Sequence, residues 1–270
     1  MVGRKKSWAF AHFADRFRKM IEGWNLRYLS IGGKEVFIKS ILQAIPLYAM
    51  QCFLMPKYFC RKLEGIMNKL WWTNNKSSKG IHWSGWESLC KSNVDGGMGF
   101  KDLVLFNKAL LAKQIWLVLT QSKCLLAKVL KVRYFPHSDI LTANVGSYPS
   151  FTWRSICSAR ELVENGLLWR IGSGSDIDIW NDPYLPRQKN NRVSIQQIFP
   201  NWTTVNQLFN CGTFTWNEEL LNNIFDVDTA NRILAIPIAG CQSEDLRVWK
   251  YDGFGEYTVK SGYRVLSINI

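Results

Sequence analysis

Apolar residues in the first half of the chain recur at helical spacing. Over residues 10–28 they return every three or four positions, which is typical of an amphipathic helix. A second helix is expected to begin after Ser30, whose hydroxyl can cap it, and to be divided at Pro46, which lacks a backbone donor. Lys39 and Gln43 are expected on its exposed face. The positions expected on its buried face are Phe37, Ile41, Ala44, Ile45 and Tyr48.

Three more helices are predicted before residue 136. One covers about residues 57–72, and another begins after Asp102, which can cap it. A short helix ends near Arg133, before Pro136. Aromatic residues of this half and beyond fall mostly at core positions, and five tryptophans are expected to be structural: Trp83, Trp86, Trp116, Trp153 and Trp180.

Short β-hairpins are predicted in the second half. Residues 168–171 and 177–180 flank a Gly-Ser-Gly-Ser loop, and residues 246–251 and 256–259 flank Asp252-Gly253. Ser261 is expected to cap a final helix. We therefore predict an α+β fold, with a helical domain over residues 1–135, a mixed segment over residues 136–245 and a distinct segment over residues 246–270, the main boundary lying near residues 136–150.

The charge of the chain is concentrated in the first half. The whole chain has 34 Lys+Arg and 21 Asp+Glu, and residues 1–135 alone hold 23 of the former and 7 of the latter. Such a surplus favours a polyanionic partner, because each phosphate neutralised by Lys or Arg releases condensed counterions. A membrane surface is the other common polyanion, and a solvated basic surface without a partner is the remaining alternative.

Cysteine and histidine usage excludes several site types. The seven cysteines form no Cys-x-x-Cys pair and the three histidines are scattered, so neither a disulfide scaffold nor a zinc site is expected, and no cofactor is predicted. A reducing intracellular compartment is implied. The apolar run over residues 41–56 is too short to span a bilayer. The first twenty residues carry six basic residues and one acid, which fits either a mitochondrial presequence or the body of the domain.

Two features could bind ions. The stretch Ser30–Lys34 puts two glycines and a lysine at a helix start, where free N–H groups attract an anion, although an ordinary capped helix has the same residues. Asp176, Asp178 and Asp182 form an acidic cluster, but a solvated hairpin face explains them better than a metal site does. The pair Asp226 and Asp228 is interpreted in the same way.

Two longer blocks carry a family resemblance. Residues 24–56 read WNLRYLSIGGKEVFIKSILQAIPLYAMQCFLMP, and residues 96–116 read GGMGFKDLVLFNKALLAKQIW. Both resemble the region just after the catalytic palm in plant LINE-class (non-LTR) retrotransposon reverse transcriptases. Shorter elements match in the same order along nearly the whole chain: Trp71-Trp72, Trp83 with Trp86, residues 133–136, residues 149–156 and residues 179–182. The chain is also similar to reading-frame fragments of plant mitochondria.

The resemblance implies that residues 1–75 form a thumb, which grips the template–primer duplex. The implied partner is duplex nucleic acid or an RNA–DNA hybrid, with an intact reverse transcriptase core as a partner in trans and no membrane. Residues 1–135 are expected to bind it and residues 136–270 not to. The expected contacts are Arg16, Arg18, Lys19, Arg27, Gly32, Gly33, Lys34 and Lys39.

The family's catalytic and metal-binding residues are missing from this chain. No Asp-Asp pair occurs, whereas the polymerase needs a Tyr-x-Asp-Asp turn for its metal ions. Residues 257–263 look like the opening of the family's zinc-binding module, without its cysteines and histidines, and no RNase H carboxylates follow. We therefore expect a non-catalytic, duplex-binding fragment, and the sequence leaves the nucleus and the mitochondrion open as its compartment. The alternative is an orphaned retroelement fragment with no biochemical role.

Overall fold

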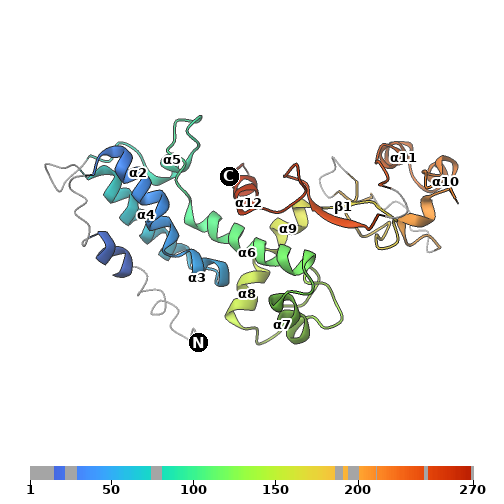
Figure 1. Ribbon diagram of the computed structural model, residues 1–270, viewed down its shortest axis with the longest axis horizontal. Helices are drawn as coiled ribbons and strands as arrows, with labels where there is room; N and C mark the ends of the chain where they lie inside the picture. Colours follow the sequence, from blue (N-terminus) through green and yellow to red (C-terminus); the bar gives the residue numbers. More distant parts are fainter. Residues whose placement is uncertain are drawn as a thin grey trace. The chain divides into compact units, whose positions relative to one another are not determined.

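The computed structural model describes residues 15–21, 29–73, 81–185, 191–193, 201–210, 212–239 and 243–268. The fold is α+β, as predicted, because helices are combined with one two-stranded antiparallel sheet (Figure 1). The chain forms two compact units. Unit 1 comprises Met1–Arg160 and Gly262–Ile270, and unit 2 comprises Glu161–Ser261, so the division lies after residue 160 and the last residues return to unit 1.

The regular secondary structure of unit 1 is helical within its described residues. Residues 15–21 form a short helix. The elements that follow are α2 (Ile31–Ser40), the 3-10 turn η2 (Leu42–Ala44), α3 (Leu47–Cys52), α4 (Lys57–Trp72), α5 (Trp86–Cys90), α6 (Leu103–Thr120), α7 (Leu125–Tyr134) and α8 (Phe151–Cys157). The helix α9 (Arg160–Gly166) begins at the boundary between the units, and α12 (Val259–Ile268) crosses it again.

The helix α6 is the centre of unit 1. It packs against α3, α4, α7 and α8, and most of its side chains are buried. Among the described residues, α6 is the one helix long and apolar enough to cross a membrane by length and composition, a test that buried core helices also pass. Its Asn107 is fully buried and joins three backbone groups: it donates to Met50 O (2.7 Å) and Phe53 O (3.0 Å) and accepts from Met55 N (2.7 Å).

The start of α6 is capped twice. The Asp102 carboxylate accepts the N–H groups of Val104 (2.8 Å) and Leu105 (3.0 Å), which confirms the predicted cap. Glu64 of α4 reaches across and accepts the N–H of Leu103 at 2.7 Å. Arg61 joins the two carboxylates, at 2.8 Å from Glu64 and 3.1 Å from Asp102. This cluster fixes α6 to α4.

The predicted buried face around Pro46 is wrong beyond Ser40. The helix α2 ends there, and the following 3-10 turn changes the number of residues per turn, which rotates every later side chain relative to the expected stripe. As a result Tyr48 is 81% exposed and Gln43 is only 2% exposed, the reverse of the prediction. Pro46 does divide the helix, since α3 starts directly after it.

Unit 2 contains the sheet and its own core. Strand β1 (Leu167–Arg170) pairs with β2 (Leu246–Trp249) in antiparallel register, with Leu168 opposite Val248. The remaining elements are the 3-10 turn η3 (Val205–Leu208), α10 (Glu218–Ile224) and α11 (Val227–Leu234). Side chains from all of these parts except β2 make one apolar cluster, with Trp169, Tyr184 and Leu221 among its buried members.

Both predicted hairpins are wrong. The first strand of one predicted hairpin, β1, pairs with the first strand of the other, β2. The Gly-Ser-Gly-Ser loop does not turn back into a strand: it wraps the carboxylate of Asp245, which accepts the N–H groups of Gly172 (2.7 Å), Gly174 (2.9 Å) and Asp176 (3.1 Å). After β2 the chain turns and enters α12. Its cap is Thr258, whose hydroxyl accepts the N–H of Ser261 at 3.1 Å, and not Ser261 as predicted.

Candidate nucleic-acid interface

The two units have opposite net charge. By sequence, unit 1 holds 26 Lys+Arg and 8 Asp+Glu, a net charge of +18, while unit 2 holds 8 Lys+Arg and 13 Asp+Glu, a net charge of −5. The division found in the structure therefore separates the charges more sharply than a division at residue 135. A surface for a polyanion is expected on unit 1.

Three of the predicted contact residues are exposed on one short helix. Over residues 15–21, Phe17 is fully buried, while Arg16, Arg18 and Lys19 are exposed. Arg18 lies 3.8 Å from Asp15, a distance at which two exposed charges interact weakly. Arg27 lies outside the described residues. These three cations are available to a phosphate backbone.

The start of α2 is an exposed, capped helix end. The Ser30 hydroxyl accepts the N–H of Gly33 at 3.2 Å, so the predicted cap is confirmed. At Gly32 a Cβ would meet nothing within 4 Å, whereas at Gly33 it would lie 3.1 Å from the Leu29 side chain. Gly32 thus leaves open space at the helix end, and Gly33 permits the close contact with Leu29.

Lys34 is not on the surface, contrary to the prediction. Its residue is 7% exposed, and its ammonium group donates to the backbone carbonyl of Thr73, directly after α4. Burial lowers the pKa of Lys34 below its usual value. The ammonium therefore satisfies a carbonyl at the end of α4, where helices leave such groups unpaired, and joins α2 to α4.

Lys39 is half-buried and paired. Its Nζ lies 2.6 Å from Glu35 Oε1, one helical turn earlier, and 5.9 Å from the centre of the Phe100 ring. Phe100 in turn stacks on Trp86 at 5.1 Å and meets the edge of Trp71 at 5.3 Å. Lys39 therefore connects the two sequence blocks that carry the family resemblance, and its charge is already partly compensated.

One face of α4, outside the contacts predicted from the sequence, is exposed and carries two lysines. We call the residues Tyr58, Lys62, Gly65 and Lys69 the α4 stripe; all four are exposed and they follow one another at steps of four, three and four. Lys62 and Lys69 lie about 10 Å apart along the helix axis. At Gly65, between them, a Cβ would meet nothing within 4 Å.

The α4 stripe suits a phosphodiester backbone. Two lysines provide charge, and the glycine between them removes the side chain that would keep a strand away from the helix. The signal was present in the sequence, since these positions lie opposite the apolar face predicted for residues 57–72. The residues that carry the family resemblance include the helix start after Ser30 and do not include these positions.

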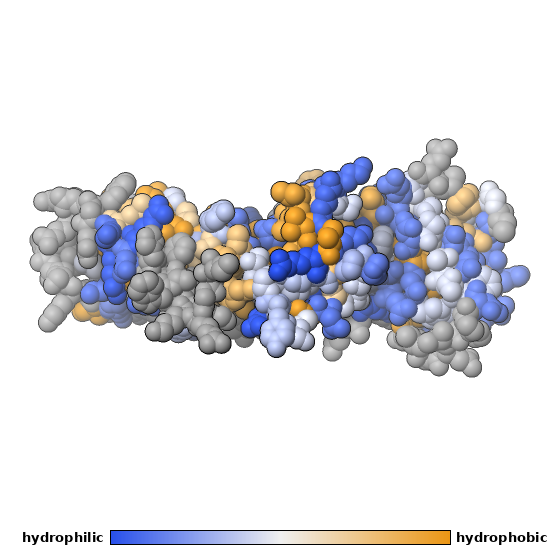
Figure 2. Space-filling view, turned by 90° about the horizontal axis from the view of Figure 1, so that it is seen from below, coloured by the Kyte–Doolittle hydropathy of each residue, from blue (hydrophilic) through white to orange (hydrophobic). Residues whose placement is uncertain are grey.

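The helix α7 also exposes cations, but in a different setting. Lys128, Lys131 and Arg133 are exposed there, and so are Leu125, Val129 and Val132, which recur at steps of four and three. Figure 2 views the side on which α7 lies in Figure 1 and shows an apolar patch bordered by hydrophilic residues. Phosphates do not need an apolar surface, so α4 matches a nucleic-acid backbone better than α7.

Four of the five tryptophans that were predicted to be structural are buried. Trp116 and Trp153 are fully buried, and Trp86 and Trp180 are nearly so, as expected. Trp83 is 78% exposed, so its predicted place in the core is wrong. Trp86 and Leu89 form the buried face of the five-residue α5, and Trp83 precedes this helix in a segment without regular secondary structure.

Three of the acidic residues singled out in the sequence accept backbone N–H groups. Asp178 accepts the N–H groups of Trp180 and Asn181, both at 2.8 Å, and Asp182 accepts the N–H of Asp178 at 2.8 Å. Asp226 caps α11 through the N–H of Thr229 at 3.1 Å, and hydrogen bonding from the Thr229 side chain, followed by this backbone bond, lowers the pKa of Asp226. Within the part of the chain that the structure describes, no three His, Cys, Asp or Glu residues are grouped so as to hold a metal ion.

Comparison with known proteins places the chain in a family. No family model matches it, and no solved structure matches it significantly. The uncharacterized mitochondrial protein AtMg00310 of Arabidopsis thaliana is 46% identical over 143 residues, which are 53% of this chain and 93% of that protein. The chain belongs to the AtMg00310 family.

A second relative is longer. The protein named putative ribonuclease H protein At1g65750, also from Arabidopsis thaliana, is 24% identical over 268 residues, which are 96% of this chain and 43% of that protein. The chain thus spans less than half of this relative, while it covers nearly all of AtMg00310. Both relatives are compatible with an origin of the AtMg00310 family in a retroelement.

Proposed function

We propose that unit 1 binds duplex nucleic acid or an RNA–DNA hybrid through its phosphates, with little sequence preference and without catalysis. The observation that carries the proposal is the net charge of +18 on one helical unit, with exposed cations at Arg16, Arg18 and Lys19 and on the α4 stripe. Binding a duplex without sequence preference requires only contacts to its phosphate backbone, so lysine and arginine on helix faces are sufficient.

Two further facts support this proposal. The family resemblance of the sequence is to the thumb region that follows a reverse transcriptase palm, and one relative is named a putative ribonuclease H protein, an activity directed at nucleic acid. The residues of this chain would supply the contact with the duplex and none of the polymerase chemistry. An intact reverse transcriptase core acting in trans is the partner that would supply that chemistry.

The proposal includes the absence of polymerase and nuclease activity. Two-metal phosphoryl transfer needs carboxylates that hold two ions about 4 Å apart, and the sequence contains no Asp-Asp pair. Pure protein is expected to extend no primer and cleave no strand in Mg²⁺ or Mn²⁺. Extension above a buffer control would refute this part of the proposal.

The central experiment measures affinity for an RNA–DNA hybrid as a function of salt. If about five cations touch phosphates, log K should fall with log[salt] at a slope of about −4 to −5. The double variant Lys62→Gln/Lys69→Gln should weaken binding to all sequences equally and flatten the slope by up to about two. The matched control is Lys128→Gln/Lys131→Gln on α7, which removes the same charge.

The outcomes separate the alternatives. A larger effect of the α4 variant than of the α7 variant places the duplex on the α4 stripe. Equal effects would indicate attraction to the overall charge of unit 1 and no defined face. A flat salt profile would refute the proposal and favour the orphaned fragment without a biochemical role.

A further inference from the structure

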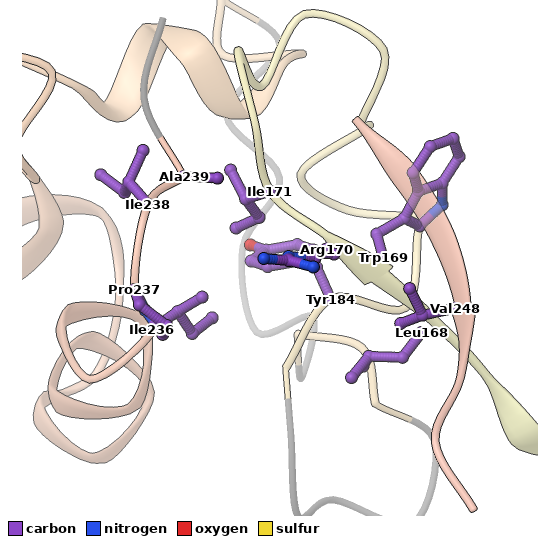
Figure 3. A pocket seen from close by; sticks show the side chains of 10 residues that line it. All are labelled: Leu168, Trp169, Arg170, Ile171, Tyr184, Ile236, Pro237, Ile238, Ala239 and Val248. Atoms are coloured by element: carbon purple, nitrogen blue, oxygen red, sulfur yellow. The ribbon is translucent and has the colours of Figure 1, made fainter. Parts of the chain in front are cut away.

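Unit 2 contains a cavity that is lined by its own residues. Its volume is about 290 Å³. The wall on one side is β1 with Ile171 and Val248, and the wall on the other side is the segment Ile236–Ala239 that follows α11 (Figure 3). A cavity of about 150 Å³ can hold a benzene ring, so this one has room for a ring with a short substituent.

Most of the lining is apolar, and the cavity has one buried hydroxyl. Tyr184 is 1% exposed, and its hydroxyl has no hydrogen-bond partner within the described part of the chain. In Figure 3 this hydroxyl points toward the side where Ile236–Ala239 lies. A buried donor without a partner destabilises the folded state, so such groups in native proteins usually mark a bound water, ion or ligand.

The hydroxyl stays protonated at physiological pH. Burial, with a smaller contribution from the Asp178 carboxylate, raises the pKa of Tyr184 above its ordinary value. Tyr184 is therefore a hydrogen-bond donor, and its natural counterpart is an oxygen acceptor on a molecule inside the cavity.

The cavity also has one cation on its lining. Arg170 is the only charged residue among the lining side chains, and it is exposed. Its guanidinium group makes no hydrogen bond or ion pair within the residues that the structure describes. An uncompensated guanidinium beside an apolar cavity selects a ligand with a carboxylate, which it can bind with two parallel hydrogen bonds.

We propose that unit 2 binds a small organic carboxylate with one ring-sized apolar body in this cavity. The ring packs against Leu168, Ile171 and Ile238, while Arg170 binds the carboxylate and the Tyr184 hydroxyl donates to an oxygen of the ligand. This site is independent of the nucleic-acid proposal, because it lies in the acidic unit and uses none of the residues of the α4 stripe.

The test uses the full chain with 3-phenylpropionate as the probe and its neutral analogue 3-phenylpropan-1-ol as the comparison. Binding is followed by saturation-transfer NMR and by the fluorescence of tryptophan, since Trp169 lines the cavity. For a ligand of this size a Kd on the order of 1 mM is expected. The carboxylate should bind about tenfold more tightly than the alcohol, because only it pairs with Arg170.

Two variants and a control assign the contacts. Arg170→Gln should abolish the preference for the carboxylate, and Tyr184→Phe should weaken both ligands about fivefold. Arg232→Gln, on α11 and outside the cavity lining, should change neither affinity. Since the Tyr184 hydroxyl has no partner, Tyr184→Phe should melt no lower than the original protein, which keeps the variant informative.

Three results would overturn the inference. One is the lack of saturable binding of either probe up to about 20 mM, well above the expected Kd. Another is equal affinity for the acid and the alcohol, which would remove the role of Arg170. The third is unchanged binding in both cavity variants, which would place the probe elsewhere on the chain.

Discussion

Lys34 and Lys62 show how two lysines on neighbouring helices of one basic unit take different roles. The ammonium of Lys34 is inside the structure and bonded to the Thr73 carbonyl, while Lys62 is exposed on the α4 stripe. A buried lysine whose donor is satisfied supports the fold, and removing it leaves a carbonyl without its partner. An exposed lysine contributes charge at little cost to stability.

The first prediction compares alanine variants of these two lysines. Lys34→Ala should lower the free energy of unfolding by roughly 1–3 kcal/mol, because a part-buried hydrogen bond and the packed methylene stem are both lost. Lys62→Ala should change it by less than about 0.5 kcal/mol. Urea unfolding followed by circular dichroism measures both. Equal stability of the two variants would contradict the structural role of Lys34.

The second prediction concerns the glycine-rich turn before Phe100. A Cβ at Gly97 would lie 2.2 Å from the backbone oxygen of Lys91, so Gly97→Ala must displace the chain and should destabilise unit 1 by roughly 2–4 kcal/mol. Gly32→Ala is the control, since a Cβ there meets nothing within 4 Å. It should be neutral or slightly stabilising. Thermal melting of the two variants tests the difference.

At the scale of elements, the capping cluster at the start of α6 joins this helix to α4 through hydrogen bonds and ion pairs. Glu64 is only 2% exposed. Its buried carboxylate pairs with Arg61, which also contacts Asp102, and it accepts the N–H of Leu103. Burial raises the pKa of Glu64 above its usual value near 4.5, with the neighbouring Asp102 charge adding to the shift, although the hydrogen bond from Leu103 and the pairing with Arg61 oppose it.

The third prediction follows from the sign of that shift. The folded state binds the proton of Glu64 more tightly than the unfolded state does, so this group's contribution to stability is present below about pH 4.5 and is lost as pH rises through the folded pKa. Glu64→Gln can still accept from Leu103 and does not titrate. The free energy of unfolding of Glu64→Gln minus that of the original protein should therefore be larger at pH 7.5 than at pH 4, which means that the variant gains relative stability as pH rises.

The control for this pH series is Glu87→Gln, on an exposed side chain 3.6 Å from Arg61. Its stability difference from the original protein should vary little with pH, because exposed ion pairs contribute little. Denaturant unfolding at several pH values measures both differences. A difference for Glu64→Gln that shrinks as pH rises would contradict the prediction.

The loop that binds Asp245 is the second feature at this scale. Three backbone N–H groups of residues 172–176 converge on one carboxylate, in the manner of an anion-binding nest. The anion comes from the residue directly before β2, so the loop positions β2 beside β1. The Gly-Ser-Gly-Ser motif, which was predicted to be the turn of a hairpin, thus holds β1 beside β2, a strand distant in the chain.

At the scale of the whole molecule, the two units differ in charge and in architecture. Unit 1 is helical and strongly basic, and unit 2 combines the sheet, its own core and a net negative charge. A polyanion should therefore distinguish them, because long-range attraction follows net charge while phosphate contacts need exposed cations. Binding by one unit only is the expected consequence.

The fourth prediction is a map of that selectivity by hydrogen exchange. Adding an RNA–DNA hybrid at about 50 mM salt should slow amide exchange in α4 and at the start of α2, and should leave β1, β2 and α11 unchanged. Raising the salt to about 200 mM should remove the protection. Protection confined to unit 2 would contradict the prediction, and so would protection that is insensitive to salt.

Sequence alone was sufficient where the deciding interaction is local. Ser30 and Asp102 cap their helices through hydrogen bonds to residues two or three positions ahead, and α4 and α7 lie where the spacing of apolar residues placed them. Pro46 divides its helix because the missing donor is a property of the residue itself. The concentration of positive charge in the first half is likewise a fact of composition.

Only the tertiary structure decided the interactions between distant residues. β1 pairs with a strand almost eighty positions later, Lys34 bonds to Thr73, and Asn107 joins the end of α3 to α6. Each requires closure of a long loop, whose entropic cost depends weakly on length, so neither spacing nor propensity distinguishes one distant partner from another. Whether a lysine supports the core or contacts a ligand is decided in the same way, by what the folded chain brings against it.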